Sequence, residues 1–169
     1  MRFLSLLTKL IFAIGLASCI TDGESDSSRS IANGSEIPAF EVLTSEGKRF
    51  SSAELSGKLA VIVFFNTDCC DCQRELPKMQ TVYEQTRDEF EWIAIGRQQD
   101  AAKAAQFWAK NSLTIPYSAQ TDRKVYSLFA TEGIPRVYIV DDLTIVAQLD
   151  PDKLRGSDEL LKTLKAITR

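Results

Sequence analysis

Apolar residues along this chain fall into short continuous runs and into stripes with helical spacing. The clearest run, Leu59–Phe65, is rich in β-branched and aromatic side chains and is too short for a core helix. It predicts a strand covered on both faces. After the run, apolar residues recur at steps of four and three, which predicts a helix with one buried stripe. The stripe comprises Cys72, Leu76, Met79, Tyr83 and Phe90.

The rest of the chain alternates strands and helices before the order changes. Residues 40–43 and 48–50 flank the polar segment 44–47, which predicts a short hairpin. The two tryptophans, Trp92 and Trp108, fall on apolar faces, so we expect them in the core and not in a binding platform. The succession of βαβ, an added αβα segment and ββα indicates an α/β fold with an inserted αβ unit. After residue 90 we expect a strand at 92–95, a helix at 101–108, a strand at 115–117, a helix at 125–129, strands at 137–140 and 145–149, and a helix at 160–167.

The N-terminal segment resembles an export signal. Arg2 and Lys9 bracket a positive region, and the apolar run 10–17 is too short for a bilayer span, which needs about 20 apolar residues. The run ends in Leu-Ala-Ser-Cys at 16–19, which resembles a bacterial lipobox. We therefore expect residues 1–18 to be a lipoprotein signal peptide and Cys19 to carry the lipid. A conventional signal peptide and a buried first helix are the alternatives.

A polar segment separates this signal from the folded part of the chain. Residues 19–35 are rich in Ser, Asp, Gly and Asn and contain almost nothing to bury, which predicts a flexible tether. From residue 36 to residue 169 the pattern becomes that of one folded domain. An anchor followed by a tether predicts a protein of the bacterial cell envelope, held at the membrane by its lipid and facing the periplasm or the cell surface.

The composition restricts the possible chemistry of the protein more than it restricts the possible fold. Of the 169 residues, 44% are apolar and 25% are charged, as in an ordinary globular domain. The formal net charge of -3 provides no basic surface for nucleic acid, so that class of partner is excluded. The chain contains no histidine, so no imidazole can act as a general base or as a metal ligand. Any catalytic group must therefore be a thiol, a carboxylate, an amine or a hydroxyl.

Three of the four cysteines crowd together at Cys69, Cys70 and Cys72. A disulfide framework would spread its cysteines along the chain, so these do not form one. They lie where the predicted strand meets the predicted helix, and helix amides at that end favour a thiolate. The C-x-x-C spacing places Cys69 exposed at the helix start and Cys72 one turn in, as thiol–disulfide exchange requires. A zinc site lacks a fourth N or S ligand, and inert buried cysteines are the other alternative.

Further motifs surround the cysteine cluster: Gly57-Lys58, the stretch Phe-Phe-Asn-Thr-Asp before Cys69, then Glu75, Pro77 and Gly133-Ile134-Pro135. With the cluster they resemble the exported thiol–disulfide oxidoreductases of the TlpA/ResA type, in the AhpC/TSA–thioredoxin superfamily. The resemblance covers most of residues 36–169. It implies a thioredoxin-like fold, with a central mixed β-sheet flanked by helices and an N-terminal β-hairpin. It also implies an enzyme without a cofactor, whose partners are cysteine-containing protein substrates and an upstream thiol electron donor.

The same resemblance implies roles for individual residues. Cys69 corresponds to the nucleophile and Cys72 to the resolving thiol. Pro135 corresponds to the cis-proline that faces them across the active site, although an ordinary trans turn proline is the alternative. Glu75 corresponds to a carboxylate that tunes the thiol pKa or relays protons, and a solvated helix carboxylate is its alternative.

This chain departs from the family pattern around the cysteines. Asp68 stands where an aromatic residue is usual, and Cys70 and Asp71 lie between the paired cysteines. Cys70 could bridge to Cys69, coordinate a soft metal or have no role. A full charge about 6 Å away contributes about 0.7 to 2.8 kcal/mol, against about 0.3 to 1 kcal/mol from the helix dipole. We therefore hypothesise that Asp68 and Asp71 leave the Cys69 thiolate less stabilised than in oxidising relatives and the disulfide comparatively hard to reduce, which would make the protein a reductant.

Two other functions are compatible with the fold. A peroxiredoxin-like peroxidase would carry threonine and proline where this chain has Asn66 and Ile62. A copper-delivery module of related fold would use a histidine, which is absent, and a longer step between its cysteines, whereas a binding module that keeps the fold would do little redox chemistry. Peroxide turnover without a thiol partner would favour the first alternative, and tight Cu(I) binding without reductase activity would favour the second.

Overall fold

A five-stranded mixed sheet forms the centre of the molecule. The structure is a computed structural model and describes residues 30–154 and 157–168. The strand order is β5 (Tyr117–Ser118), β4 (Glu91–Gly96), β3 (Leu59–Phe65), β6 (Arg136–Asp141) and β7 (Thr144–Leu149). Strands β3, β4 and β5 run parallel, whereas β6 pairs antiparallel with β3 and β7 pairs antiparallel with β6.

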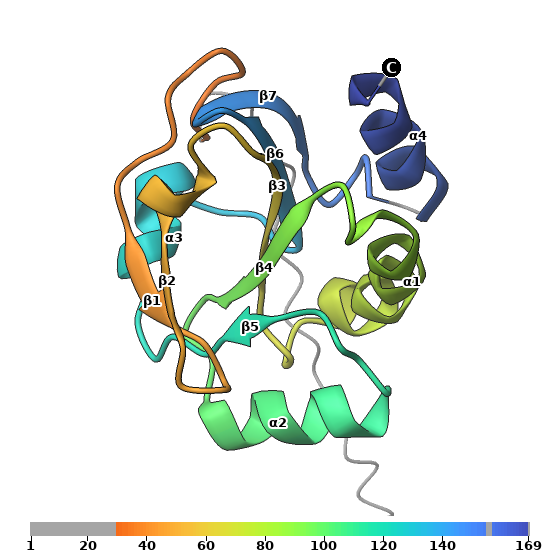
Figure 1. The fold of residues 1–169 in the computed structure, drawn as a ribbon. Helices are drawn as coiled ribbons and strands as arrows, with labels where there is room; N and C mark the ends of the chain where they lie inside the picture. Colours follow the sequence, from red (N-terminus) through yellow and green to blue (C-terminus); the bar gives the residue numbers. More distant parts are fainter. Residues whose placement is uncertain (1–29, 155–156, 169) are drawn as a thin grey trace, which may run out of the picture.

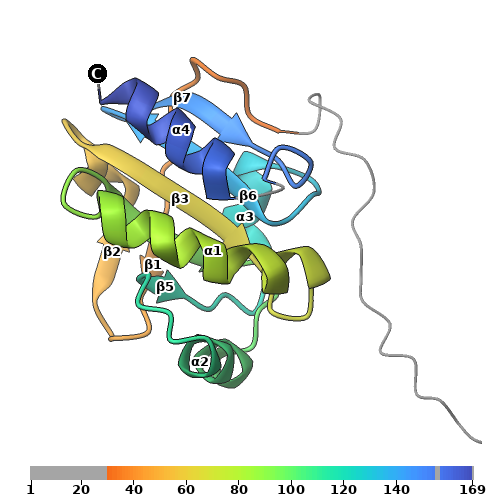
Figure 2. The same cartoon turned by 90° about the vertical axis from the view of Figure 1, so that its right-hand side faces the viewer.

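Helices cover both faces of this sheet (Figures 1 and 2). Helices α1 (Cys70–Thr86) and α4 (Ser157–Ile167) lie together on one face. Helix α3 (Lys124–Phe129) lies on the other face, and α2 (Ala101–Lys110) lies beside the edge strand β5. The side of α3 also carries the hairpin of β1 (Glu41–Leu43) and β2 (Arg49–Ser51), followed by a short 3-10 helix, η2 (Ser52–Leu55). This arrangement confirms the predicted α/β architecture.

The central strand β3 is covered on both faces, as its apolar run predicts. Each of its residues from 60 to 65 is at most 1% exposed. Neighbouring side chains in a strand point to opposite faces. Phe64 accordingly contacts the aromatic rings of α3, whereas Phe65 packs against Trp108 of α2 at 4.8 Å between ring centroids. Trp108 and Trp92 are both buried, so both are core residues as expected.

The parallel pairing of β3 and β4 determines where a site can form. Phe65 at the end of β3 lies opposite Gly96 at the end of β4. Because both strands run in the same direction, the loops that leave them emerge side by side at one edge of the sheet. These loops are residues 66–69, which lead into α1, and residues 97–100, which lead into α2.

The structure differs from the sequence prediction at several element boundaries and contains one element that was not predicted. Helix α1 ends at Thr86, so Phe90 lies beyond the helix but is still buried. Strand β5 begins at Tyr117 and not at Ile115, because Pro116 between them has no backbone N–H to pair. The 3-10 helix η2 was not predicted, because four residues are too few to show a periodic pattern of apolar positions.

The folded domain begins earlier than the predicted boundary at residue 36. The backbone N–H of Ile31 donates to the Phe129 carbonyl at 2.7 Å, and Gly34 N–H donates to the Ile145 carbonyl at 2.8 Å. Ile31 also packs against the core. Residues 30–35 are therefore part of the domain and not of the tether, because one apolar side chain and a few backbone pairings suffice to fix a short polar stretch.

The predicted signal peptide, the lipidation site Cys19 and most of the tether lie outside the described residues. Within the described ranges, no helix combines the length and the apolar character that crossing a membrane requires.

Candidate active site

The cysteine cluster lies where β3 passes into α1, as the sequence predicts. Cys69 has extended backbone dihedrals and is the N-cap residue of α1, and Cys70 is the first helical residue. The N–H of Cys69 donates to the Asn66 carbonyl at 3.1 Å, and the Cys69 carbonyl accepts from Gln73 N–H at 2.9 Å. These two bonds turn the chain from strand to helix within the four residues 66–69. The Cys69 sulfur consequently lies at the amino end of the helix, one turn before Cys72.

Both cysteines of the C-x-x-C pair are free thiols, and both are buried. Cys72 has no exposed surface and Cys69 is 5% exposed, so the expectation of an exposed Cys69 is wrong. The reason is the loop before β6, since the Cys69 thiol donates a hydrogen bond to the Ile134 carbonyl at 3.6 Å. Cys70 is not a free thiol. Because Cys69 is free, no bridge joins it to Cys70 in this structure.

The two thiols have opposite pKa shifts. The pKa of Cys69 is lowered from 9.0 to about 6, first because the Cys72 thiol donates a hydrogen bond to the Cys69 thiolate. The backbone N–H groups of Cys72 and Asp71 lower this pKa further, while burial and the Asp71 charge raise it. Burial raises the pKa of Cys72 well above its ordinary value, and the neighbouring Cys69 adds to this rise. One thiol therefore ionises near neutral pH while the other retains its proton.

The loop opposite Cys69 contains the predicted cis-proline. The Ile134–Pro135 peptide bond is cis, which confirms that prediction. Gly133 has a φ of 83°, a conformation that favours glycine, and its carbonyl accepts a hydrogen bond from the Tyr126 hydroxyl at 3.1 Å. These features hold the loop so that the carbonyl immediately before Pro135 faces the Cys69 sulfur.

The two carboxylates beside the cysteines each have a cationic partner. The Lys103 ammonium lies 2.7 Å from the Asp68 carboxylate, and the Arg74 guanidinium lies 2.6 Å from that of Asp71. These partners partly neutralise both charges. The Asp71 charge raises the Cys69 pKa, as hypothesised, but the hydrogen-bond donors lower it by more. The effect of the two carboxylates on the reduction potential stays a prediction.

Glu75 is not the solvated helix carboxylate that was its alternative. It is 2% exposed. Its carboxylate accepts from Arg74 Nε at 2.7 Å and from Lys78 Nζ at 3.2 Å. These three residues line a groove of about 350 Å³ beside Asp71. The ion pairs compensate the burial of the charge, and the role of Glu75 in thiol chemistry stays a prediction.

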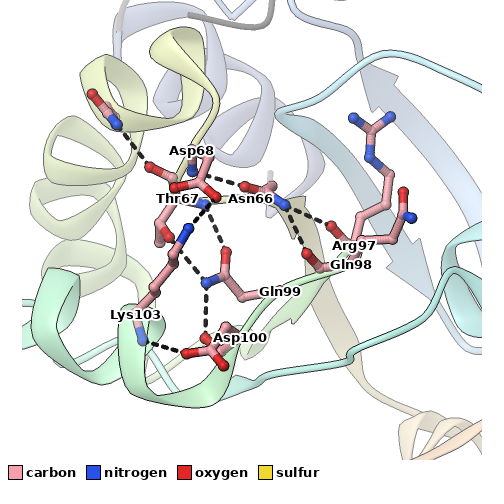
Figure 3. A network of polar contacts seen from close by, with 9 residues as sticks. Asn66, Thr67, Asp68, Arg97, Gln98, Gln99, Asp100 and Lys103 are labelled. Carbon is pink, nitrogen blue, oxygen red and sulfur yellow. Dashed lines mark hydrogen bonds and ion pairs between the residues drawn. The ribbon is translucent and has the colours of Figure 1, made fainter. Parts of the chain in front are cut away.

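A polar network around Thr67 links the loop before Cys69 to the loop after β4 (Figure 3). Thr67 N–H donates to Gln99 Oε1 at 2.6 Å, and Gln99 Nε2 donates to Thr67 Oγ1 at 2.9 Å. Gln73 Nε2 donates to the Thr67 carbonyl at 2.7 Å. Nearby, Asn66 Nδ2 donates to the carbonyls of residues 97 and 98. The sequence did not point to Gln99, because its partner lies 32 residues away and no local pattern signals such a pair.

Among residues 30–154 and 157–168, no group of three or more cysteine, aspartate or glutamate side chains could hold a metal ion.

Comparison with known proteins supports the same chemistry. Residues 33–149 match the model of the AhpC/TSA family. The thiol-disulfide oxidoreductase ResA of Bacillus thuringiensis is 26% identical over 137 residues, which cover 80% of this chain and 78% of the relative.

Two solved structures share the fold. The thioredoxin domain of a thiol-disulfide oxidoreductase from Bacteroides vulgatus superposes with a TM-score of 0.72 at 23% identity, covering 83% of this chain and all of that one. A thioredoxin-family thiol:disulfide interchange protein from Chlorobium tepidum gives a TM-score of 0.68, also at 23% identity, with coverages of 81% and 98%. The comparisons confirm the predicted thioredoxin-like fold and the likeness to the TlpA/ResA type.

Proposed function

The chain belongs to the AhpC/TSA family, and we propose that it exchanges disulfides with cysteine-containing proteins through Cys69 and Cys72. One observation carries this proposal: two free thiols one helical turn apart have pKa values shifted in opposite directions. Exchange needs one sulfur that attacks as a thiolate and a second that is held back until a mixed disulfide exists. The relative from Bacillus thuringiensis carries the name of this activity.

In the first step the Cys69 thiolate attacks one sulfur of the client disulfide. A bond forms between Cys69 and that sulfur while the client's own S–S bond breaks. The second client sulfur leaves as a thiolate and takes a proton from solvent. The lowered pKa of Cys69 means that much of this thiol is ionised at neutral pH, so the step needs no histidine base.

In the second step Cys72 loses its proton and attacks the Cys69 sulfur of the mixed disulfide. The Cys69–Cys72 bond forms, and the first client sulfur leaves as a thiolate that is then protonated. The client gains two electrons, which the protein loses, and two protons. One proton balances the proton that Cys72 releases, and the other comes from solvent because Cys69 attacks as a thiolate. The Cys72 thiol loses its hydrogen-bond acceptor once Cys69 is bonded to the client, so the coupling that raises its pKa is relieved. An upstream thiol donor reduces the protein again.

The direction of electron flow that fits this site is reduction of the client. A thiolate that is strongly stabilised makes an oxidant, as in DsbA with a thiol pKa of about 3.5, whereas thioredoxin, a reductant, has a thiol pKa of about 7. The Cys69 pKa of about 6 is nearer to that of thioredoxin. The support for a reductant is this moderate shift and not the pair of carboxylates.

The N-terminal sequence supports export and anchoring by a lipid on Cys19. The protein would then act in the bacterial cell envelope on clients that fold outside the cytoplasm. A Cys19→Ser variant expressed in the native host should leave the membrane fraction and lose incorporation of labelled fatty acid. Continued membrane association of that variant would contradict the anchor without affecting the proposed chemistry.

A Cys72→Ser variant tests the exchange reaction directly. Without the resolving thiol, the first step should stop at a mixed disulfide between Cys69 and the client, visible as a larger species on a non-reducing gel and lost on reduction. A double variant that also carries Cys69→Ser is the matched control and should trap nothing. If neither variant traps a client while the wild type consumes hydrogen peroxide, the peroxidase alternative is favoured.

A further inference from the structure

We propose that Gln99 is a positioning residue for the redox reaction, because it fixes Thr67 and thereby the place of Cys69 opposite Cys72 and the Ile134 carbonyl. We call residues 66–69 the redox loop. Gln99 touches neither sulfur in any hydrogen bond described above, and it comes from a different strand–helix connection. Its effect on the reaction would therefore pass through the loop.

The contact between Gln99 and Thr67 is a buried two-point pairing. Gln99 is 1% exposed and Thr67 is 6% exposed. The Gln99 amide accepts from Thr67 N–H at 2.6 Å and donates to Thr67 Oγ1 at 2.9 Å (Figure 3). Breaking it would leave a backbone N–H without a partner away from water, which is unfavourable. The pairing therefore fixes both the position and the orientation of Thr67.

Gln99 is itself rigidly held. Its N–H donates to the Gln120 carbonyl at 2.6 Å, and its Nε2 also donates to the Asp100 carbonyl at 2.9 Å. Asp100 is the N-cap of α2, where its carboxylate accepts from Lys103 N–H. A fixed donor and acceptor on a helix start is what a positioning contact requires.

Gly96 lets the end of β4 lie very close to the connection that carries Gln99. A Cβ atom at position 96 would lie 2.5 Å from Gln99 Cβ and 3.1 Å from the Gln120 backbone nitrogen. Every residue except glycine would place a Cβ at position 99, so this contact reflects the close approach of the two segments and not the glutamine itself. The close packing fixes the place from which the Gln99 side chain extends toward Thr67.

The pairing acts on Cys69 because only Asp68 separates the two residues. Thr67 is held at its N–H by Gln99 and at its carbonyl by Gln73, which lies on α1. Asp68, next in the loop, forms an exposed ion pair with Lys103 of α2. Since the redox loop is fixed to both helices, the Cys69 sulfur keeps its distance from the Cys72 thiol and from the helix amides. The strength of these hydrogen bonds falls steeply with misalignment.

A second glutamine provides a matched control. Gln80 on α1 pairs with Thr114 in the same two-point manner, accepting from Thr114 N–H at 2.8 Å and donating to its Oγ1 at 2.7 Å. Gln80 is also buried, at 7% exposure. It lies eight residues after Cys72, about 12 Å along the helix axis. Loss of this pairing should affect folding in the same way but leave the thiols unchanged.

The experiment compares Gln99→Met with Gln80→Met in the full chain. The pH dependence of Cys69 alkylation by iodoacetamide, measured on the reduced protein, reports the Cys69 pKa without any client. We expect Gln99→Met to raise that pKa by about 0.5 to 1 unit and to change the reduction potential. Gln80→Met should lower the melting temperature comparably and shift the Cys69 pKa by less than about 0.2 unit.

Variants of the partner keep the inference testable if Gln99→Met does not fold. Thr67→Val removes only the hydroxyl, so we expect a smaller rise of the Cys69 pKa, and Thr67→Ser should restore the wild-type value. Folded Gln99→Met or Thr67→Val proteins with an unchanged Cys69 pKa would overturn the inference. So would an equal shift in Gln80→Met, since that would show general loosening of the fold.

The inference rests on the proposed function only in taking Cys69 as the attacking thiol. The two can fail separately. If Cys72→Ser traps no client but Gln99→Met still raises the Cys69 pKa, the exchange function fails and the positioning role stands. If clients are trapped but Gln99→Met leaves the Cys69 pKa unchanged, the exchange function stands and the positioning role fails.

Discussion

Cys69 and Cys72 are separated by one turn of α1, yet the two regions around them differ in almost every respect. Cys69 lies at the helix start, beneath the loop of Pro135, and meets hydrogen-bond donors from the Cys72 thiol and from two helix amides. Cys72 lies within the core and has no exposed surface. The result is a lowered pKa for one and a raised pKa for the other.

This difference shows that burial alone does not decide how a thiol behaves. Both residues are classed as buried, and burial raises the pKa of each. For Cys69, however, donors aimed at the sulfur outweigh the cost of burial. The hydrogen-bond donors that reach the Cys69 sulfur, above all the Cys72 thiol, therefore affect its pKa more than burial does.

The largest expected effect comes from removing each thiol in turn. Cys69→Ser should reduce the rate of reduction of a disulfide-closed peptide to the uncatalysed rate and also abolish alkylation at neutral pH. Cys72→Ser should abolish turnover but preserve alkylation. Turnover assays and mass spectrometry after iodoacetamide treatment distinguish these patterns, and rapid alkylation of Cys72 in the Cys69→Ser protein would contradict the division of roles.

The next effect concerns the hydrogen bond between the two thiols. In Cys72→Ala the Cys69 thiolate loses its strongest donor, so its pKa should rise from about 6. Hydrogen bonds to charged groups contribute about 1.5 to 3 kcal/mol, which corresponds to about one to two pH units. The alkylation midpoint measures this shift. A midpoint that stays near 6 would show that the helix end alone stabilises the thiolate.

The opposite shifts also predict how stability depends on pH. Cys69 binds its proton less tightly in the folded chain, so its stabilising contribution is complete above about pH 9 and is lost as pH falls through about 6. Cys72 has the raised pKa, so its contribution is complete below about pH 9 and is lost as pH rises further. Urea unfolding of the reduced protein, relative to Cys69→Ser, should therefore show stability that increases between about pH 6 and 9. A flat difference would contradict the pKa of Cys69.

The smallest effect comes from the charges beside Cys69. Asp71→Asn removes a charge that raises the Cys69 pKa, so the pKa should fall by a few tenths of a unit at low salt. Arg74→Gln removes the partner of Asp71 and should shift the pKa in the opposite direction by a similar amount. Alkylation midpoints at low and high salt test both changes, since added salt should diminish each shift.

Much of the fold was predictable because its signals are local. The apolar run of β3 and the helical stripe of α1 each reveal their element within a window of a few residues. The cysteine spacing likewise places both sulfurs at one helix end, and the confirmed cis Pro135 follows from the resemblance to a known family.

The rest of the site depends on partners that are distant in sequence. Asp68 looked like an unpaired charge, but α2 brings Lys103 to within 2.7 Å of it across 35 residues. Cys69 looked exposed, but the loop at Ile134 covers it. The contacts of residues 30–35 could not be predicted from their composition, because they are backbone hydrogen bonds that do not depend on the side chains.

The close approach of Gly96 to Gln99 has a consequence for how such a sequence can change over generations. A Cβ at position 96 would lie 2.5 Å from Gln99 Cβ and 3.1 Å from the Gln120 backbone nitrogen, and a smaller side chain at position 99 removes neither contact unless it is glycine. Descendants of a common ancestor should therefore keep glycine at position 96 even where position 99 changes. A lineage that loses this glycine should also carry changes that move the connection 97–100 away from β4.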